Sequence, residues 1–345
     1  MYFKTVFIKL IYVTAILILG VSCTNNNHSK VNTSSADSTL TELESAKVIS
    51  RQIESDPENA ELYYQRAVVY FDQKYLDRSL LDIDDALKLS AQNPLYYFYK
   101  GKILYAMNRT QDAAKAYESA IALKEDYNEA RLKLATLYYV VKEHQKSIDA
   151  LNVLIASDPS NAEGQFYKGM NQKEMKDSAR AIASFQKALE IDNNYYDAAM
   201  QLGLLFAAKK DKIATEYFAT AIRLNPRSTE AYFGRAYYYQ LTKQYQKSLF
   251  DYRKVIEYDP SNDKAYYNVG YINYEAGKYD EAMRSWNICI EMNNQNIMAY
   301  YMRGLLHEQR KNYSDAKLNY EFVLQLDPNY TLAEEGLQRL VKKLK

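Results

Sequence analysis

The chain has 345 residues, and its 44 lysines and arginines nearly balance its 43 acidic residues, so the formal net charge at pH 7 is +1. This balance provides no summed field that would attract nucleic acid, which argues against nucleic acid as a partner. Only 10 glycines and 6 prolines occur among many alanine, leucine, lysine, glutamate and tyrosine residues, a composition that favours helix over turn-rich β folds.

Residues 1–22 have the pattern of a secretory signal. Two lysines precede an apolar run from Leu10 to Leu19, and Gly20-Val21-Ser22 stands directly before Cys23. The apolar run is too short for a transmembrane helix. We therefore expect this segment to direct export.

The end of this segment, residues 16–23, resembles the lipobox of bacterial lipoproteins, in which the signal is removed and the cysteine becomes the acylated first residue. The sequence departs from the usual pattern because Leu19 lies four places before the cysteine, and Gly20 takes the place of the typical leucine. The resemblance implies lipidation of Cys23. The alternative is an ordinary cleaved signal that leaves a free thiol.

Residues 23–39 are expected to form the lipidated cysteine and a flexible tether, because they contain too few apolar residues to support a core. Such a coil spans roughly 20 to 25 Å, enough to hold a folded body off a membrane. By family resemblance, an aspartate after the cysteine retains lipoproteins in the inner membrane of enteric bacteria, and Thr24 stands there instead. We therefore expect a lipoprotein of the bacterial cell envelope, anchored in the outer membrane.

Residues 40–59 have the apolar spacing of a helix and are expected to cap the N-terminal face of the following array. The segment contains Asp56-Pro57, and the same dipeptide recurs at Asp158-Pro159, Asp259-Pro260 and Asp327-Pro328. It therefore reads as the second half of a truncated repeat.

From residue 60 to residue 330 the sequence repeats every 34 residues, with one period of 33. Three further series keep this register: small residues from Ser79 to Ala316, bulky residues from Ile83 to Tyr320, and mostly apolar residues from Ala86 to Val323. The most regular series consists of small residues, at Ala67, Gly101, Ala135, Gly169, Gly203, Ala236, Gly270 and Gly304.

This four-part register resembles the tetratricopeptide repeat (TPR). In that family the first small residue lets helix A lie close against helix B, and the bulky series fills the space between them. The resemblance implies an all-α, right-handed superhelical solenoid of eight helix pairs. The expected repeats are 60–93, 94–127, 128–161, 162–195, 196–228, 229–262, 263–296 and 297–330.

Two features agree with this division. All six prolines fall at the junctions between repeats, where they do not interrupt a helix. The fifth repeat lacks one residue, which we place between its two helices. After the last repeat, residues 331–345 form an amphipathic pattern and are expected to be a C-terminal capping helix.

Motifs for catalysis or cofactor binding are not found in the sequence. It contains no phosphate-binding loop, dinucleotide fingerprint, HExxH or GxSxG motif. His28, His144 and His307 are scattered, and each is interpreted as a solvated or packed structural histidine. Cys289 occupies a position that is elsewhere small and apolar, so a buried hydrophobic role is favoured. We expect no enzyme activity, no cofactor and no metal site.

A concave groove lined by the A helices is the expected binding surface, by family resemblance. Relatives that clamp a peptide's terminal carboxylate carry lysine at the fifth and asparagine at the ninth position of the repeat, whereas aromatic residues prevail here. The alternative is that fifth-position residues pack between repeats. The candidate groove residues are Phe233, Tyr237, Tyr267, Asn268, Tyr271, Tyr274 and Tyr301.

These observations predict a membrane-anchored scaffold or adaptor that binds a peptide segment or a partner protein in its groove, in cell-envelope assembly or secretion. Aromatic faces also stack on sugar rings, so a glycan- or nutrient-capturing lipoprotein is the alternative. Capture proteins of that kind usually add loops to build the sugar site, and no insertion interrupts this array.

Overall fold

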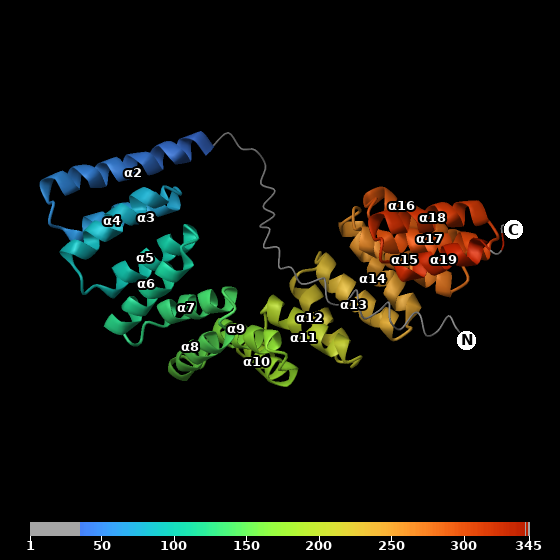
Figure 1. Cartoon of the computed structure of the whole chain (residues 1–345). Helices are drawn as coiled ribbons and strands as arrows, with labels where there is room; N and C mark the ends of the chain where they lie inside the picture. The colour runs from blue at the N-terminus through green and yellow to red at the C-terminus, as the bar shows by residue number, and fades with distance from the viewer. Residues whose placement is uncertain (1–34, 342, 344–345) are drawn as a thin grey trace. The chain divides into compact units, whose positions relative to one another are not determined.

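The computed structural model describes residues 35–341 and 343, and for residues 35–43 it describes the backbone alone. In this part of the chain the regular elements are 18 α-helices joined by short connections (Figure 1). The predicted all-α repeat solenoid is confirmed, and its right-handed superhelical path stays a prediction. The predicted signal 1–22, Cys23 and most of the tether lie outside the described residues. Helices α2 to α19 include none with the length and hydropathy needed to cross a bilayer.

The chain divides into two compact units at Leu89. The first unit contains α2 (Ser35–Ser55), α3 (Ala60–Asp72) and α4 (Leu76–Leu89). Helix α2 packs on α3 and buries Ala46 and Ile53. It begins inside the segment 23–39 that was predicted as a tether.

The second unit contains the remaining helices. Each A helix begins at the residue that opens the corresponding predicted repeat. The helices are α5 (Pro94–Ala106), α6 (Thr110–Leu123), α7 (Asn128–Val140), α8 (His144–Ser157), α9 (Ala162–Glu174), α10 (Ser178–Ile191), α11 (Tyr196–Ala208), α12 (Ala214–Leu224), α13 (Thr229–Leu241), α14 (Tyr245–Tyr258), α15 (Asp263–Glu275), α16 (Tyr279–Met292), α17 (Ile297–Gln309), α18 (Tyr313–Leu326) and α19 (Thr331–Val341).

The turns between helix A and helix B share one backbone feature. One residue in each turn has a positive φ. The N–H of the residue after it donates a hydrogen bond to a carbonyl in the last turn of helix A, as Arg109 N does to Leu104 O at 2.9 Å. Only Gly277 is a glycine; the others are Lys74, Asn108, Lys142, Lys176, Lys210, Lys243 and Lys311. In the fifth repeat Asp211 N closes α11 on Phe206 O at 3.0 Å, and α12 begins only at Ala214, so it has 11 residues against 14 in α10.

Within each pair, helix A approaches helix B at the first small residue. A Cβ atom added to Gly203 would lie 2.7 Å from the ring of Phe218, and one added to Gly270 would lie 2.4 Å from the ring of Trp286. Carbon atoms in proteins do not approach so closely without displacing a neighbour. The absence of a side chain on helix A therefore allows a large ring on helix B.

Repeats with alanine at this place use a second contact. In each of them the serine twelve positions later donates a hydrogen bond to the alanine carbonyl: Ser79 to Ala67 at 2.6 Å, Ser147 to Ala135 at 2.7 Å and Ser248 to Ala236 at 2.8 Å. The five repeats with glycine carry an alanine instead of this serine. In the glycine repeats, helix A and helix B thus meet where a side chain of helix B packs on the glycine backbone. In the alanine repeats, a serine hydroxyl of helix B also donates a hydrogen bond to helix A.

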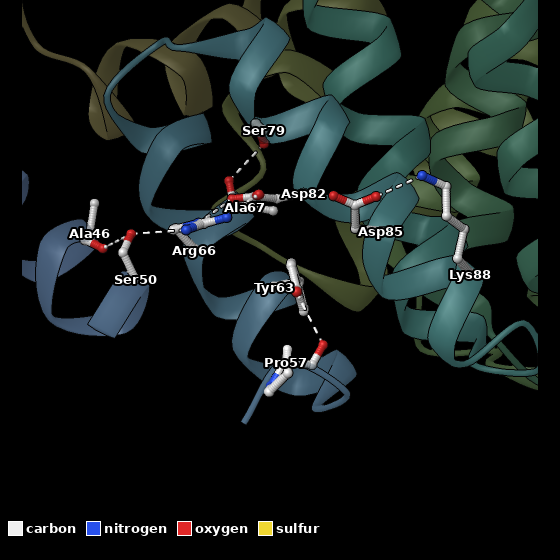
Figure 2. A network of polar contacts seen from close by, with 10 residues as sticks. All are labelled: Ala46, Ser50, Pro57, Tyr63, Arg66, Ala67, Ser79, Asp82, Asp85 and Lys88. Atoms are coloured by element: carbon white, nitrogen blue, oxygen red, sulfur yellow. Dashed lines mark hydrogen bonds and ion pairs between the residues drawn. The ribbon is translucent and has the colours of Figure 1, made fainter. Parts of the chain in front are cut away.

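A polar network connects the three helices of the first unit (Figure 2). The Arg66 guanidinium on α3 donates to both carboxylate oxygens of Asp82 on α4, at 2.8 and 2.7 Å, and to Ser50 Oγ on α2 at 2.9 Å. Ser50 in turn donates to the Ala46 carbonyl at 2.9 Å. A single side chain on α3 therefore connects both neighbouring helices.

The contact between Gly203 and Phe218 can be tested with a double-mutant cycle. We expect Gly203→Ala to lower the free energy of unfolding by about 1 to 3 kcal/mol, because the added methyl group overlaps the ring. Phe218→Leu in the same chain reproduces the natural pair Ala135 and Leu151, so the double variant should lose less than the sum of the single losses. Chemical unfolding followed by circular dichroism measures all four proteins. Additive losses would contradict the contact.

Candidate binding groove

The fifth-position candidates on α13, α15 and α17 pack against the core: Tyr301 is buried, and Phe233 and Tyr267 are half-buried. The ring of Phe233 lies 5.3 Å from that of Tyr252, and the ring of Tyr301 lies 5.4 Å from that of Tyr330. The backbone carbonyl of Tyr267 accepts a hydrogen bond from Trp286 Nε1 at 3.2 Å. Burial also raises the pKa of the Tyr267 hydroxyl well above its ordinary value. These contacts favour the structural alternative for this position.

The ninth-position tyrosines are not fully enclosed. Tyr237 on α13 and Tyr271 on α15 are both half-buried, and burial raises the pKa of each hydroxyl. Tyr271 packs against the core cluster around Tyr252. The Tyr237 hydroxyl forms no hydrogen bond within the described part of the chain. Both rings therefore keep surface available for a partner.

The last two candidates support the helices instead. Asn268 is buried, and its Nδ2 donates to the Lys264 carbonyl one turn earlier at 2.8 Å. The Tyr274 hydroxyl donates to Gln309 Oε1 at 3.2 Å, which joins α15 to the end of α17. Tyr237 and Tyr271 are both half-buried, and the binding role of all seven residues stays a prediction.

Three polar residues at groove positions of the fourth and fifth repeats were not singled out from the sequence. Lys173 Nζ donates to Gln201 Oε1 at 2.9 Å, and burial lowers the pKa of the lysine. Asp197 precedes Gln201 by four residues on α11, and burial raises the pKa of its carboxyl group. Their repeat positions were the available signal, because these positions of a repeat face the predicted groove.

His144 and Cys289 lie among residues that support the fold. His144 Nδ1 lies 3.1 Å from Asn171 Oδ1, and Asn171 Nδ2 donates to Ser147 Oγ at 2.8 Å. Cys289 is completely buried, and burial raises the pKa of its thiol to about 12. A reactive cysteine needs accessible thiolate, so the predicted hydrophobic role of Cys289 is confirmed. No cluster of three metal-binding side chains occurs among the described residues.

Buried ionisable groups predict loss of stability at high pH. Burial raises the pKa of Cys289 from 9.0 to about 12 and that of Tyr301 from 10.0 to about 12. Above pH 9 the unfolded chain therefore binds fewer protons than the folded chain, and the free energy of unfolding decreases as pH rises toward 12.

A series of melting curves between about pH 7 and 11 measures this dependence. Cys289→Ala is the matched variant, because alanine occupies the corresponding position in the first two repeats, as Ala86 and Ala120. It should show a shallower decline between pH 9 and 10. A melting temperature that is constant up to pH 11 would contradict the burial of these groups.

Comparison with known proteins identifies the repeat. Models of the tetratricopeptide repeat match residues 100–162, 162–195, 229–262, 251–284 and 299–330, which together span more than half of the chain. Anaphase-promoting complex subunit 7 of Dictyostelium discoideum is 24% identical over 167 residues, which cover 48% of this chain and 28% of that protein.

A TPR repeat-containing protein of Methanocaldococcus jannaschii is 22% identical over 221 residues, covering 61% of this chain and 39% of that protein. The chain thus spans well under half the length of either relative. Among solved structures, the C-terminal part of a TPR repeat-containing protein from Cytophaga hutchinsonii has a TM-score of 0.60 at 19% identity, over 70% of this chain and 99% of that one. The fold and the repeat matches together place this chain in the tetratricopeptide-repeat family.

Proposed function

We propose that this protein is a membrane-anchored scaffold that binds a peptide segment or a partner protein on its A helices, in cell-envelope assembly or secretion. The observation that carries the proposal is the partial exposure of the ninth-position tyrosines. Tyr237 and Tyr271 keep part of their surface outside the core, whereas Tyr301 at the fifth position is buried against Tyr320. Tyrosine combines a large contact area with a hydroxyl that orients a partner, as binding hot spots require.

The anchor rests on the sequence. An apolar run of signal length ends just before Cys23, and a polar segment follows it. Such an arrangement delivers an exported domain to a membrane surface and leaves a folded body free to meet partners. Outer-membrane attachment agrees with Thr24 after the cysteine.

Tyr237→Ala with Tyr271→Ala is expected to weaken partner capture by about 2 kcal/mol or more, because two hot-spot rings are removed. The loss of folding stability should stay below the ~3 to 5 kcal/mol of a buried aromatic truncation, since both rings are only half-buried. Capture from host envelope extract and a melting curve give the two readouts.

The matched control is Tyr266→Ala, because Tyr266 is also half-buried on α15 but precedes Tyr267 in a position outside the predicted groove. The control should retain its partners. Full retention by the double variant, or loss of its fold, would assign both tyrosines a structural role. Binding of the wild type to a polysaccharide panel, without protein capture, would favour the glycan alternative.

Lipidation predicts that Cys23→Ala abolishes incorporation of a labelled lipid precursor and either releases the protein from membranes or leaves the uncleaved precursor. Metabolic labelling and fractionation after cell breakage measure both effects, with Cys289→Ala as the cysteine control. A Cys23→Ala protein that still incorporates label and fractionates like wild type would exclude the anchor.

A further inference from the structure

A Tyr-x-x-Arg motif occurs three times on the A helices, at Tyr63–Arg66, Tyr232–Arg235 and Tyr300–Arg303. In each copy the guanidinium lies over the tyrosine ring, with distances from its carbon to the ring centroid of 5.9, 5.7 and 5.1 Å respectively. In each copy the residue sixteen positions later, on helix B, faces the guanidinium. The three copies can therefore be compared group by group.

In two copies the arginine is paired with an aspartate of the same repeat. Arg66 donates from Nε and Nη2 to Asp82 at 2.8 and 2.7 Å, and Arg235 donates in the same way to Asp251 at 2.8 Å for both bonds. The Asp82 and Asp251 side chains are almost completely buried. Paired hydrogen bonds of this kind satisfy one edge of the guanidinium and neutralise its charge.

The third copy has an amide where the other two have a carboxylate. Arg303 Nε donates to Asn319 Oδ1 at 2.8 Å, and Arg303 Nη1 donates to Asn287 Oδ1 at 2.9 Å. Asn319 Nδ2 is directed to the Asp315 carbonyl at 2.8 Å. Within the described residues Arg303 forms no ion pair, and its Nη2 has no acceptor. Burial lowers the pKa of Arg303, whereas the paired Arg66 and Arg235 have raised pKa values.

A pocket of about 520 Å³ opens beside this guanidinium, between α16, α17 and α18. Its apolar part includes the rings of Tyr300 and Phe322, which lie 4.3 Å apart, and Leu318, which is 61% exposed at the surface. An apolar side chain from outside could therefore lie next to a group bound by Arg303.

The other charges of the pocket restrict the ligand. Asp315 accepts a hydrogen bond from Asn312 at 2.6 Å, and Glu321 pairs with Lys317 at 3.6 Å. Burial lowers the pKa of His307, which favours its neutral form. Because Lys317 pairs with Glu321, the charges of Asp315 and Arg303 nearly cancel in the pocket, and a singly charged carboxylate meets less repulsion there than a doubly charged phosphate group. A single carboxylate matches the arrangement.

We propose that Arg303 is a binding site for the carboxylate of a glutamate or aspartate side chain from a protein partner, with an adjacent apolar residue packed on Phe322 and Leu318. The incoming carboxylate completes on Arg303 the arrangement that Asp82 and Asp251 provide within the other two repeats. The open pocket and its exposed Leu318 suit a side chain carried on a peptide. This site differs from the proposed groove: it lies between helices α16 and α18, and it uses none of the groove tyrosines.

The probe is an acetylated and amidated peptide, Ala-Leu-Glu-Phe-Ala, and its glutamine counterpart is the neutral control. The full chain in detergent should bind the glutamate peptide at least tenfold more tightly, measured by nuclear magnetic resonance titration. Equal binding of the two peptides would overturn the proposal. Sodium propionate is the free-carboxylate arm, and propionate binding as tight as the peptide would overturn the assignment to a protein side chain.

Asn319→Asp is the decisive variant, because it supplies the internal carboxylate of the other two copies. It should lose peptide binding at least tenfold while its melting temperature is unchanged or higher, so a folding defect cannot explain the loss. Arg303→Gln should lose binding as well. Arg310→Gln is the control, because it removes the same charge from an exposed pair with Asp280 at the end of α17. Wild-type binding by Asn319→Asp, or equal losses in both arginine variants, would refute the site.

Discussion

The distance between helix A and helix B is set in each repeat by one contact, between a residue with little or no side chain and a large side chain on the facing helix. Where helix A carries a glycine, as at Gly101 or Gly270, the facing residue is an aromatic ring that would overlap even a methyl group. Because a solenoid repeat packs mainly on its neighbours, this local distance is transmitted along the array by repetition rather than by a central core. The position of every groove residue depends on it.

In seven of the eight repeats the two members of this contact change size together. Glycine faces tyrosine, phenylalanine or tryptophan, whereas Ala67 faces Ile83 and Ala135 faces Leu151; Ala236, with Tyr252, is the exception. Tyr320 has bare backbone on two sides, since a Cβ atom on either Gly304 or Gly336 would approach its ring within 2.9 Å. Interiors packed to crystal-like density tolerate a change of one partner poorly. Each pair is therefore a unit that can vary between repeats while the helix spacing stays nearly constant.

The sequence was sufficient for the fold because its period and its small residues reflect this contact directly. It did not indicate the left-handed residues such as Lys74, because lysine has no intrinsic preference for positive φ and the helix end imposes the conformation. The start of α2 at Ser35 was also missed, since a polar composition suggested a tether. For the groove, helical spacing placed Phe233 and Tyr237 on one face, but the ring contact of Phe233 with Tyr252 depends on the facing helix α14 and could not be predicted from that spacing. The comparison of Asn319 with Asp82 likewise needs the facing helix to be known.

Helix α17 carries two partly buried charged residues, Glu308 and Arg303, and their surroundings differ. Burial alone would raise the pKa of Glu308, but hydrogen bonds from Arg339 at 3.0 Å, Lys343 at 3.1 Å and Tyr320 at 2.9 Å lower it. This carboxylate fixes the capping helix α19 to the eighth repeat and is fully satisfied. Arg303, earlier on the same helix, has only neutral hydrogen-bond partners, while Asp315 acts on it at longer range, so its Nη2 remains available for a ligand. A rigid element with one unsatisfied donor is pre-organised for a ligand, because little conformational entropy is lost when the ligand binds. The capping network therefore bears on recognition as well as on the stability of the chain's C-terminal end.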